Sequence, residues 1–196
     1  KFNIDRDFGI QAYFLNEKKD AFSYNIKTAV TTGEGRNWTK SPDNGVALTG
    51  KIELFPLGSF TKDGSNFEGD LAREKTPKLL LSGAFHQNNN ARRTQGQLGD
   101  DLYQQKTMKS FFADAMLKYN GWAAMATYMS RTANNPIAID PLDPTLSNYV
   151  YTGKGMDYQL SYTFPTNYEI IGRFSTQTAN KDIKALTPDT NEYTIG

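Results

Sequence analysis

The sequence predicts an all-β chain built around an antiparallel sheet. Short segments with a hydrophobic residue at every second position recur throughout its 196 residues, which is the period of a strand with two unlike faces. Segments with a helical period are few, and Gly and Asn are frequent. Asn120–Gly121 separates two of the period-two segments, and Asn-Gly is the strongest short-range signal for a hairpin. Strands are expected at 8–15, 21–32, 46–55, 78–86, 110–119, 122–131, 153–164, 168–177 and 192–196.

Most of these segments carry one apolar and one polar face. From the N-terminus onward, the apolar faces contain Phe8, Ile10, Ala12, Phe14, Phe22, Tyr24, Ile26, Val30, Val46, Leu48, Ile52, Leu54, Leu79, Leu81, Phe85, Met156, Tyr158, Leu160, Tyr162, Phe164, Tyr168, Ile170 and Phe174. The interleaved residues are polar: Ser23, Asn25, Lys27, Thr31, Thr49, Lys51, Glu53, Asp157, Gln159, Ser161, Thr163, Glu169, Arg173 and Ser175. A transmembrane barrel has this alternation with the apolar face outward, and a soluble sandwich has it with the apolar face inward. Alternation alone does not separate the two.

The hairpin at 108–131 has a predicted register. A two-residue turn at Asn120–Gly121 pairs Tyr119 with Trp122, Leu117 with Ala124, Ala115 with Ala126 and Ala113 with Tyr128. This face is apolar, with aromatic residues at both ends and small residues between. The opposite face carries Asp114, Lys118 and Thr127.

The connections favour the membrane barrel. They are short after the first, fifth and seventh strands, and long after the second, fourth, sixth and eighth strands, at 33–45, 87–109, 132–152 and 178–191. Short turns at one end and long loops at the other are typical of outer-membrane barrels. Segment 56–77 breaks the rule, because it is long on the short-turn side.

Aromatic residues flank the short turns on the apolar face, and we expect them at a lipid interface. They are Phe14, Phe22, Tyr119, Trp122, Phe164 and Tyr168. Phe111 and Tyr128 lie at the other end of the 108–131 hairpin. Eight residues at ~3.3 Å each, tilted by about 40°, separate the two levels by about 20 Å. This approaches the ~25 Å apolar band of an outer-membrane barrel.

Composition excludes several functions. With 22 basic and 21 acidic residues the net charge is +1, which argues against a nucleic-acid partner. Cysteine is absent and His86 is the only histidine, so enzymatic chemistry has little support and no cofactor is expected. The loop carboxylates of 140–144 and 99–101 lack the spacing of an EF-hand, and no metal site is predicted.

The charged residues of the polar faces are the candidate site. Strand parity places Lys27, Lys51, Lys118 and Arg173 there, with Lys78 near the turn end. The same parity places Glu53, Asp114, Asp157 and Glu169 there. Basic rings favour anions and acidic rings favour cations, so the wall is either an anion ladder or a salt-bridged, hydrated surface.

Three further segments carry charges. Arg92 and Arg93 in loop 87–109, and Arg36 and Lys40 in the 33–45 connection, are candidate phosphate ligands or solvated partners of lipopolysaccharide. Segment 68–78 is predicted to form a short helix or turn before Pro77 that ties turns together.

Several stretches, read in order, resemble the phosphate-selective porin O and P family, in particular its Bacteroidota members. They are "DRDFGIQ", "GEGRN", "LTGKIELFPLGSF", "GDLAREKTPKLLLSGAF", "SFFADAMLKYNGWAAMATY", "YTGKGMDYQLSYTFPTNYEIIGRFS" and "NEYTIG". The resemblance implies a transmembrane barrel of sixteen strands, a homotrimer in the bacterial outer membrane, that passes small ions or solutes, including phosphate, by diffusion. Nine strands would then be a segment of that barrel.

Two alternatives remain open at this point. One is a soluble all-β binding domain with the apolar face buried. The other is a client or partner of the barrel-assembly machinery, or of another outer-membrane complex.

Overall fold

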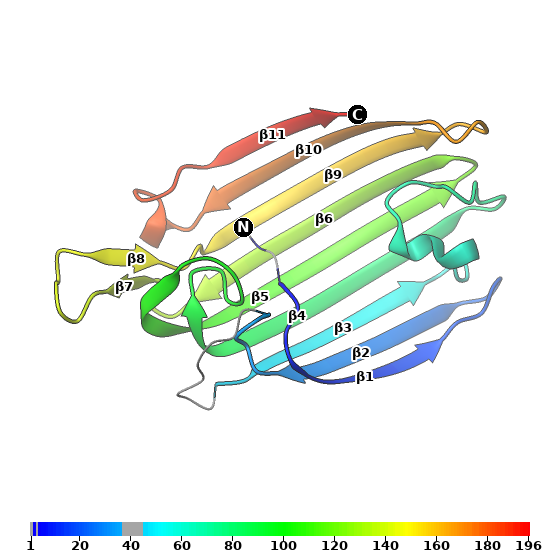
Figure 1. Cartoon of the computed structure of the whole chain (residues 1–196). Helices are drawn as coiled ribbons and strands as arrows, with labels where there is room; N and C mark the ends of the chain where they lie inside the picture. The colour runs from blue at the N-terminus through cyan, green and yellow to red at the C-terminus, as the bar shows by residue number, and fades with distance from the viewer. Residues whose placement is uncertain (1, 3, 37–44) are drawn as a thin grey trace.

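The computed structural model describes residues 2, 4–36 and 45–196 and shows an antiparallel sheet of nine strands (Figure 1). The spatial order is β1-β2-β3-β4-β5-β6-β9-β10-β11, so the order of these strands in the sheet is their order in the sequence. All nine expected strands are confirmed. Their bounds are β1 Gly9–Asn16, β2 Ser23–Thr31, β3 Ala47–Phe55, β4 Lys78–Arg93, β5 Asp101–Tyr119, β6 Trp122–Ala133, β9 Gly153–Thr163, β10 Glu169–Ala179 and β11 Thr190–Ile195.

The long connection after β6 contains a small hairpin that the sequence did not predict. Strands β7 (Ile137–Ile139) and β8 (Ser147–Tyr149) pair with each other and form a separate two-stranded sheet. β6 and β9 therefore remain direct neighbours. Figure 1 shows this hairpin projecting beyond one end of the large sheet. A short 3₁₀ helix, η2 (Lys181–Ile183), occupies the β10–β11 connection.

Strands β4 and β5 are much longer than expected, at 16 and 19 residues. They take up most of 87–109, so the prediction of a long loop there is wrong and only residues 94–100 connect the strands. The sequence signal fades after His86 because both faces become polar, while the backbone ladder continues to pair Asn88 with Met108 and Ala91 with Lys106. At ~3.3 Å per residue, these strands extend well beyond a ~25 Å apolar band.

The hairpin between β5 and β6 has the predicted register. Tyr119 pairs with Trp122, Ala115 with Ala126 and Ala113 with Tyr128. Asn120 and Gly121 have φ values of 49° and 91°, as a type I′ turn requires at both central positions. Gly121 is also needed for space, because a Cβ atom there would collide with the carbonyl oxygen of Thr163.

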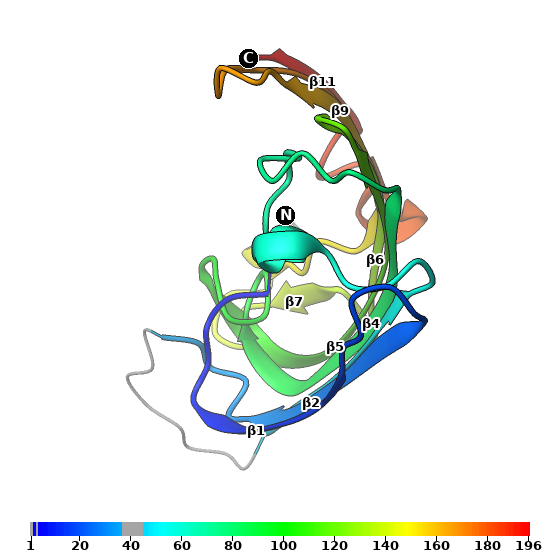
Figure 2. The same ribbon diagram turned by 90° about the vertical axis from the view of Figure 1, so that its right-hand side faces the viewer.

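The sheet is strongly curved, and its two faces differ in chemistry. Figure 2 shows the N-terminal residues and the 3₁₀ helix η1 (Thr61–Asn66) on the concave side. Lys118 reaches this helix and its neighbours from the sheet, so the polar face is the concave one. The convex face exposes Ile10, Phe14, Ile26, Val30, Leu48, Ile52, Leu81, Phe85, Phe111, Leu117, Tyr119, Trp122, Met156, Tyr158, Leu160, Ile170 and Tyr193.

The buried apolar residues form three small clusters rather than one core. One joins Phe55, Phe60, Leu80 and Met116, and lies where residues 56–77 cover the concave face. Another joins Phe2, Tyr151, Ala179 and Ile183. The third joins Ala91, Met108 and Val150 near the long-loop end. The concave side is thus covered in part, at these clusters, while the large apolar side chains of the convex side stay exposed.

The sheet is open. Strand β1 pairs with β2 and strand β11 with β10, and these two outer strands are exposed along nearly their whole length. Among residues 2, 4–36 and 45–196 the structure contains no helix with the length and apolar character needed to cross a bilayer.

Candidate functional site

Residues 56–77, here called the inner segment, fold from the short-turn end onto the concave face (Figure 2). Its only regular element is η1, which precedes the stretch predicted to be helical or turned. Residues 68–77 form turns without a helix, so the helical option is wrong and the turn option is confirmed. Lys62 and Asp63 both have positive φ, at 49° and 55°, a conformation that is unfavourable for residues other than glycine.

Lys118 anchors the inner segment to the sheet. Its Nζ donates hydrogen bonds to the carbonyl oxygens of Gly64 (2.8 Å), Phe67 (2.5 Å) and Gly69 (2.6 Å). The side chain is buried, and all three ammonium N–H groups have a carbonyl to bind. The expectation that Lys118 faces solute is therefore wrong: it lies on the predicted face, beneath the inner segment.

The inner segment also joins two of the short turns. Asp70 Oδ2 accepts a hydrogen bond from the backbone N–H of Gly121 (2.7 Å), in the β5–β6 turn. Arg73 donates to the carbonyl oxygen of Thr163, at the end of β9, and to Asn120 Oδ1 (3.2 Å). The Asn120 N–H donates to the carbonyl oxygen of Glu74 (2.8 Å). These contacts confirm that residues 68–78 tie turns together.

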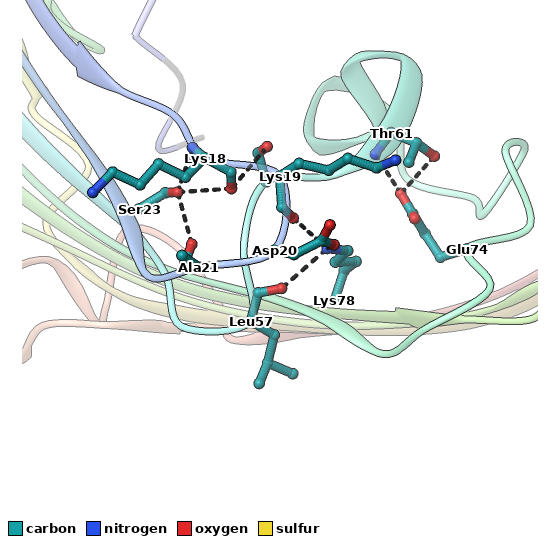
Figure 3. Close-up of polar contacts among 10 residues, drawn as sticks. Lys18, Lys19, Asp20, Ala21, Ser23, Leu57, Thr61, Glu74 and Lys78 are labelled. Carbon is teal, nitrogen blue, oxygen red and sulfur yellow. Dashed lines mark hydrogen bonds and ion pairs between the residues drawn. The ribbon is translucent and has the colours of Figure 1, made fainter.

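Lys78 has a similar structural role at the β1–β2 turn (Figure 3). Its Nζ donates to the carbonyl oxygens of Lys19 (2.7 Å) and Leu57 (3.0 Å), and it lies 3.5 Å from Asp20 Oδ1. Because the Lys78 side chain is buried, its ammonium holds this turn against the start of the inner segment instead of facing solute, contrary to the expectation from parity.

Lys27, Lys51 and Glu53 form one compact group on the concave face of β2 and β3. Lys27 Nζ lies 2.8 Å from Glu53 Oε2, and Lys51 Nζ lies 2.8 Å from Glu53 Oε1. The carboxylate side chain is 9% exposed, whereas the two lysine side chains are 35% and 37% exposed. Parity had placed the three on one face, and the structure brings them together as a salt-bridged group.

A second charged group on the polar face forms around Asp157. Arg173 Nε lies 2.7 Å from Asp157 Oδ2, and Ser175 Oγ donates to the same oxygen at 2.5 Å. Ser175 and Asp157 are direct partners in the β9–β10 ladder, which brings the pair together. Asp114 accepts a hydrogen bond from Ser82 Oγ (2.8 Å), its ladder partner on β4.

The loop arginines are placed differently from the prediction. Arg92 and Arg93 lie at the end of β4, where Arg93 Nε is 3.7 Å from Asp101 Oδ1. Consecutive strand residues tend to point to opposite faces, which disfavours a joint clamp on one phosphate. Arg36 binds Asp5 through Nε (2.6 Å) and Nη2 (3.0 Å). Lys40 lies outside the described residues.

Residue 2 and residues 4–8, here called the N-terminal strap, cross the concave side of the sheet (Figure 2). Phe2 packs edge-on against Tyr151, with ring centroids 5.3 Å apart. Asp7 accepts hydrogen bonds from Thr32 Oγ1 (2.7 Å) and the Gly33 N–H (2.6 Å). Burial by itself raises the pKa of Asp7, but the hydrogen bonds from Thr32, Gly33 and neighbouring groups outweigh it, so the pKa lies below its ordinary value.

Sequence reasoning missed Arg131 on the concave face of β6. Its guanidinium carbon lies 5.9 Å from the centre of the Phe2 ring, and its Nε donates to Ser110 Oγ (3.2 Å). The side chain is buried although it carries a charge. Strand parity could have found it, because Arg131 lies four residues after Thr127 on the same face.

His86 lies inside β4, not at a strand end, and its Nδ1 is 2.8 Å from Thr49 Oγ1 on the adjacent strand. Asp140 and Asp143 accept hydrogen bonds from the backbone N–H groups of Leu142 and Thr145, two residues on, as in Asx turns. Among the residues that the structure describes, no group of three or more His, Asp or Glu side chains could hold a metal ion.

The aromatic residues that flank the short turns are all exposed on the convex side, namely Phe14, Phe22, Tyr119, Trp122, Phe164 and Tyr168. Phe14 stacks on Tyr24 with centroids 5.9 Å apart, and Tyr162 contacts both Trp122 and Phe164 at 4.9 Å. Their exposure agrees with the placement expected from parity.

The chain was compared with family models, curated proteins and solved structures, and no match was found.

Proposed function

We propose that this chain forms part of an outer-membrane β-barrel that passes small hydrophilic solutes or ions by passive diffusion. One observation carries the proposal: between the short turns and Phe111, the convex face of the curved sheet exposes large apolar side chains, while charged side chains such as Lys27, Glu53 and Asp114 lie on the concave face. A soluble sheet needs the opposite arrangement, because its apolar face must be buried. Lipid is the solvent for which an exposed apolar convex face is stable.

The ends of the strands support the same proposal. Exposed aromatic rings at the short turns and at Phe111 bracket a mid-section of small residues, among them Ala113, Ala115, Ala124 and Ala126. The strands β4 and β5 then continue beyond the apolar stretch into polar sequence at the other end. This is the plan of a barrel with short periplasmic turns and extracellular strands that project into water.

The open edges of β1 and β11 require further strands in a bilayer, since unpaired backbone groups are not tolerated in hydrocarbon. We place the nine strands within a larger barrel, and the resemblance to phosphate-selective porins suggests sixteen strands, a homotrimer and a bacterial outer membrane. The small-residue surface of β5 and β6 is then available to lipid or to a neighbouring protomer.

The polar face supports a mixed-charge wall rather than a continuous anion ladder. Lys27 and Lys51 share Glu53, and Arg173 is paired with Asp157. Lys118 and Lys78 hold backbone carbonyls. Phosphate and other anions remain proposed solutes because Lys27, Lys51 and Arg173 are partly exposed and carry accessible positive charge.

The test is planar-bilayer conductance of the whole protein, with the reversal potential measured in a salt gradient. Stepwise increases in conductance support a porin, and a reversal potential that indicates anion preference supports phosphate or other anions as solutes. Channels that do not discriminate between anions and cations would support the porin and contradict the proposed preference for anions. Folded protein that fails to conduct or to enter lipid vesicles contradicts the proposal and favours a soluble binding domain.

A further inference from the structure

A polar cavity lies between the inner segment and the concave wall of β1, β2 and β3. Its volume is about 450 Å³, enough for a small organic molecule. The wall contributes Asn25, Lys27 and Lys51, and the inner segment contributes Asp63 and Asn66 across from them. The two sides come from distant parts of the sequence and are held together by Lys118 and Lys78.

The wall side offers cationic donors. Glu53 holds one oxygen to each lysine at 2.8 Å and is itself nearly buried, while both lysines are about one-third exposed. An ammonium group has three N–H donors, so each lysine retains donors after binding Glu53. A solute in the cavity therefore meets two ammonium groups whose positions are fixed by the Glu53 carboxylate.

The opposite side offers acceptors. Asp63 is exposed and lines the cavity from a left-handed backbone conformation, and Lys62 before it has the same conformation. Two consecutive non-glycine residues in this region are unfavourable, and such strain is found at positions that serve a ligand. On the wall, Glu17 also lines the cavity and accepts a hydrogen bond from Asn25 Nδ2 (2.9 Å), so a second exposed carboxylate faces the solute.

We propose that this cavity is a recognition subsite for a small organic acid that also carries hydrogen-bond donors, either hydroxyl or ammonium groups. The carboxylate binds Lys27 and Lys51, and the donors reach Asp63 and Glu17. A simple carboxylate satisfies only the lysine side, and a second anionic group is repelled by Asp63. The inference rests on the proposed passage of solutes along the concave face, and it names the class that is retained there.

The experiment uses the whole protein in planar bilayers and measures how each probe reduces the KCl current. The probes are gluconate, which has hydroxyl donors, and L-serine, which has an ammonium and a hydroxyl. Propionate and succinate are the comparison acids. We expect gluconate, L-serine or both to half-block the current at concentrations at least tenfold below those of propionate and succinate. The stronger of the two identifies the preferred donor.

The variant Asp63→Asn isolates the acceptor side, because Asn tolerates the left-handed backbone and removes only the charge. It should raise the half-blocking concentration of the donor-bearing acids toward that of propionate. Lys51→Met should weaken all carboxylates alike. Asp182→Asn, an exposed carboxylate in η2 of the β10–β11 connection, is the matched control and should leave the block unchanged.

The outcomes separate the subsite from the function. If the channels conduct but gluconate, L-serine and propionate block them equally, the proposed subsite is wrong and the proposed porin function still stands. Discrimination that survives both Asp63→Asn and Lys51→Met also overturns it. Absence of conductance contradicts the proposed function itself.

Discussion

Ala115 provides a direct test of the proposal that the convex face of the sheet meets lipid. It lies on the convex face of β5, opposite Leu81 on one side and Ala126 on the other. Phe111 and Tyr119 are each four residues away along the strand. Four residues at ~3.3 Å and a tilt of about 40° correspond to ~10 Å along a barrel axis, so the proposed barrel would hold Ala115 near the bilayer midplane.

Ala115→Arg should destabilise the folded barrel by about 2–4 kcal/mol, the cost of an arginine on the lipid face at the midplane. At 1.4 kcal/mol per factor of ten, this is a loss of about 30- to 700-fold in the folding equilibrium. The assay is reversible urea unfolding of the whole protein in lipid vesicles, followed by tryptophan fluorescence and by protease protection.

Thr127→Arg is the matched control. Thr127 follows Ala126 on β6, so its side chain points to the concave face, and it is the ladder partner of Asp114. An arginine there meets polar surroundings and an adjacent carboxylate, and stability should change by less than about 1 kcal/mol. If Thr127→Arg abolishes folding while Ala115→Arg is tolerated, the face assignment is inverted and the membrane proposal fails.

Three further predictions follow from the concave side. Lys118→Met removes the donor from three carbonyls and should lower stability by about 2–4 kcal/mol, with proteolysis at residues 56–77 as the local readout; unchanged protection would contradict the anchoring role. Because the folded-state pKa of Asp7 is lowered, its ionised form stabilises the fold above the unfolded pKa of about 3.9, and this contribution disappears as pH falls through the folded pKa. Asp7→Asn should therefore be less stable at pH 7 and show a shallower loss below pH ~4, as measured by urea midpoints across pH; equal slopes would refute this. Asp114→Arg should still fold and move the reversal potential toward anions, whereas an unchanged potential would show that Asp114 lies away from the ion path.

The strands were predictable because hydrophobic residues recur at every second position along them. This pattern indicates both that a strand is present and which side chains share a face. The register of β5 and β6 followed from Asn120–Gly121 alone, since a two-residue turn determines every later pair. The end of β4 was not predictable in this way, because residues 87–93 are polar apart from Ala91, and backbone pairing with β5 continues the strand without a period-two pattern.

The sequence predicted which face of the sheet carries the candidate residues, but not which groups each of them contacts. Parity correctly placed Lys27, Lys51 and Glu53 on one face, and their mutual pairing follows from neighbouring strands. Parity could not show that Lys118 is covered, because the covering carbonyls belong to a segment about fifty residues away. Burial by a distant, irregular segment leaves no periodic trace in the sequence.

The contact between Arg73 and Thr163 also has a consequence for the order of assembly. These residues are 90 positions apart, and the contact can form only after β4, β5, β6 and β9 have been aligned. Closing so long a loop is entropically unfavourable until the intervening pairings are in place. The inner segment should therefore dock late in folding, after the hairpins have formed. Cleavage of the backbone within residues 68–77 would leave the strands paired but prevent this last docking step.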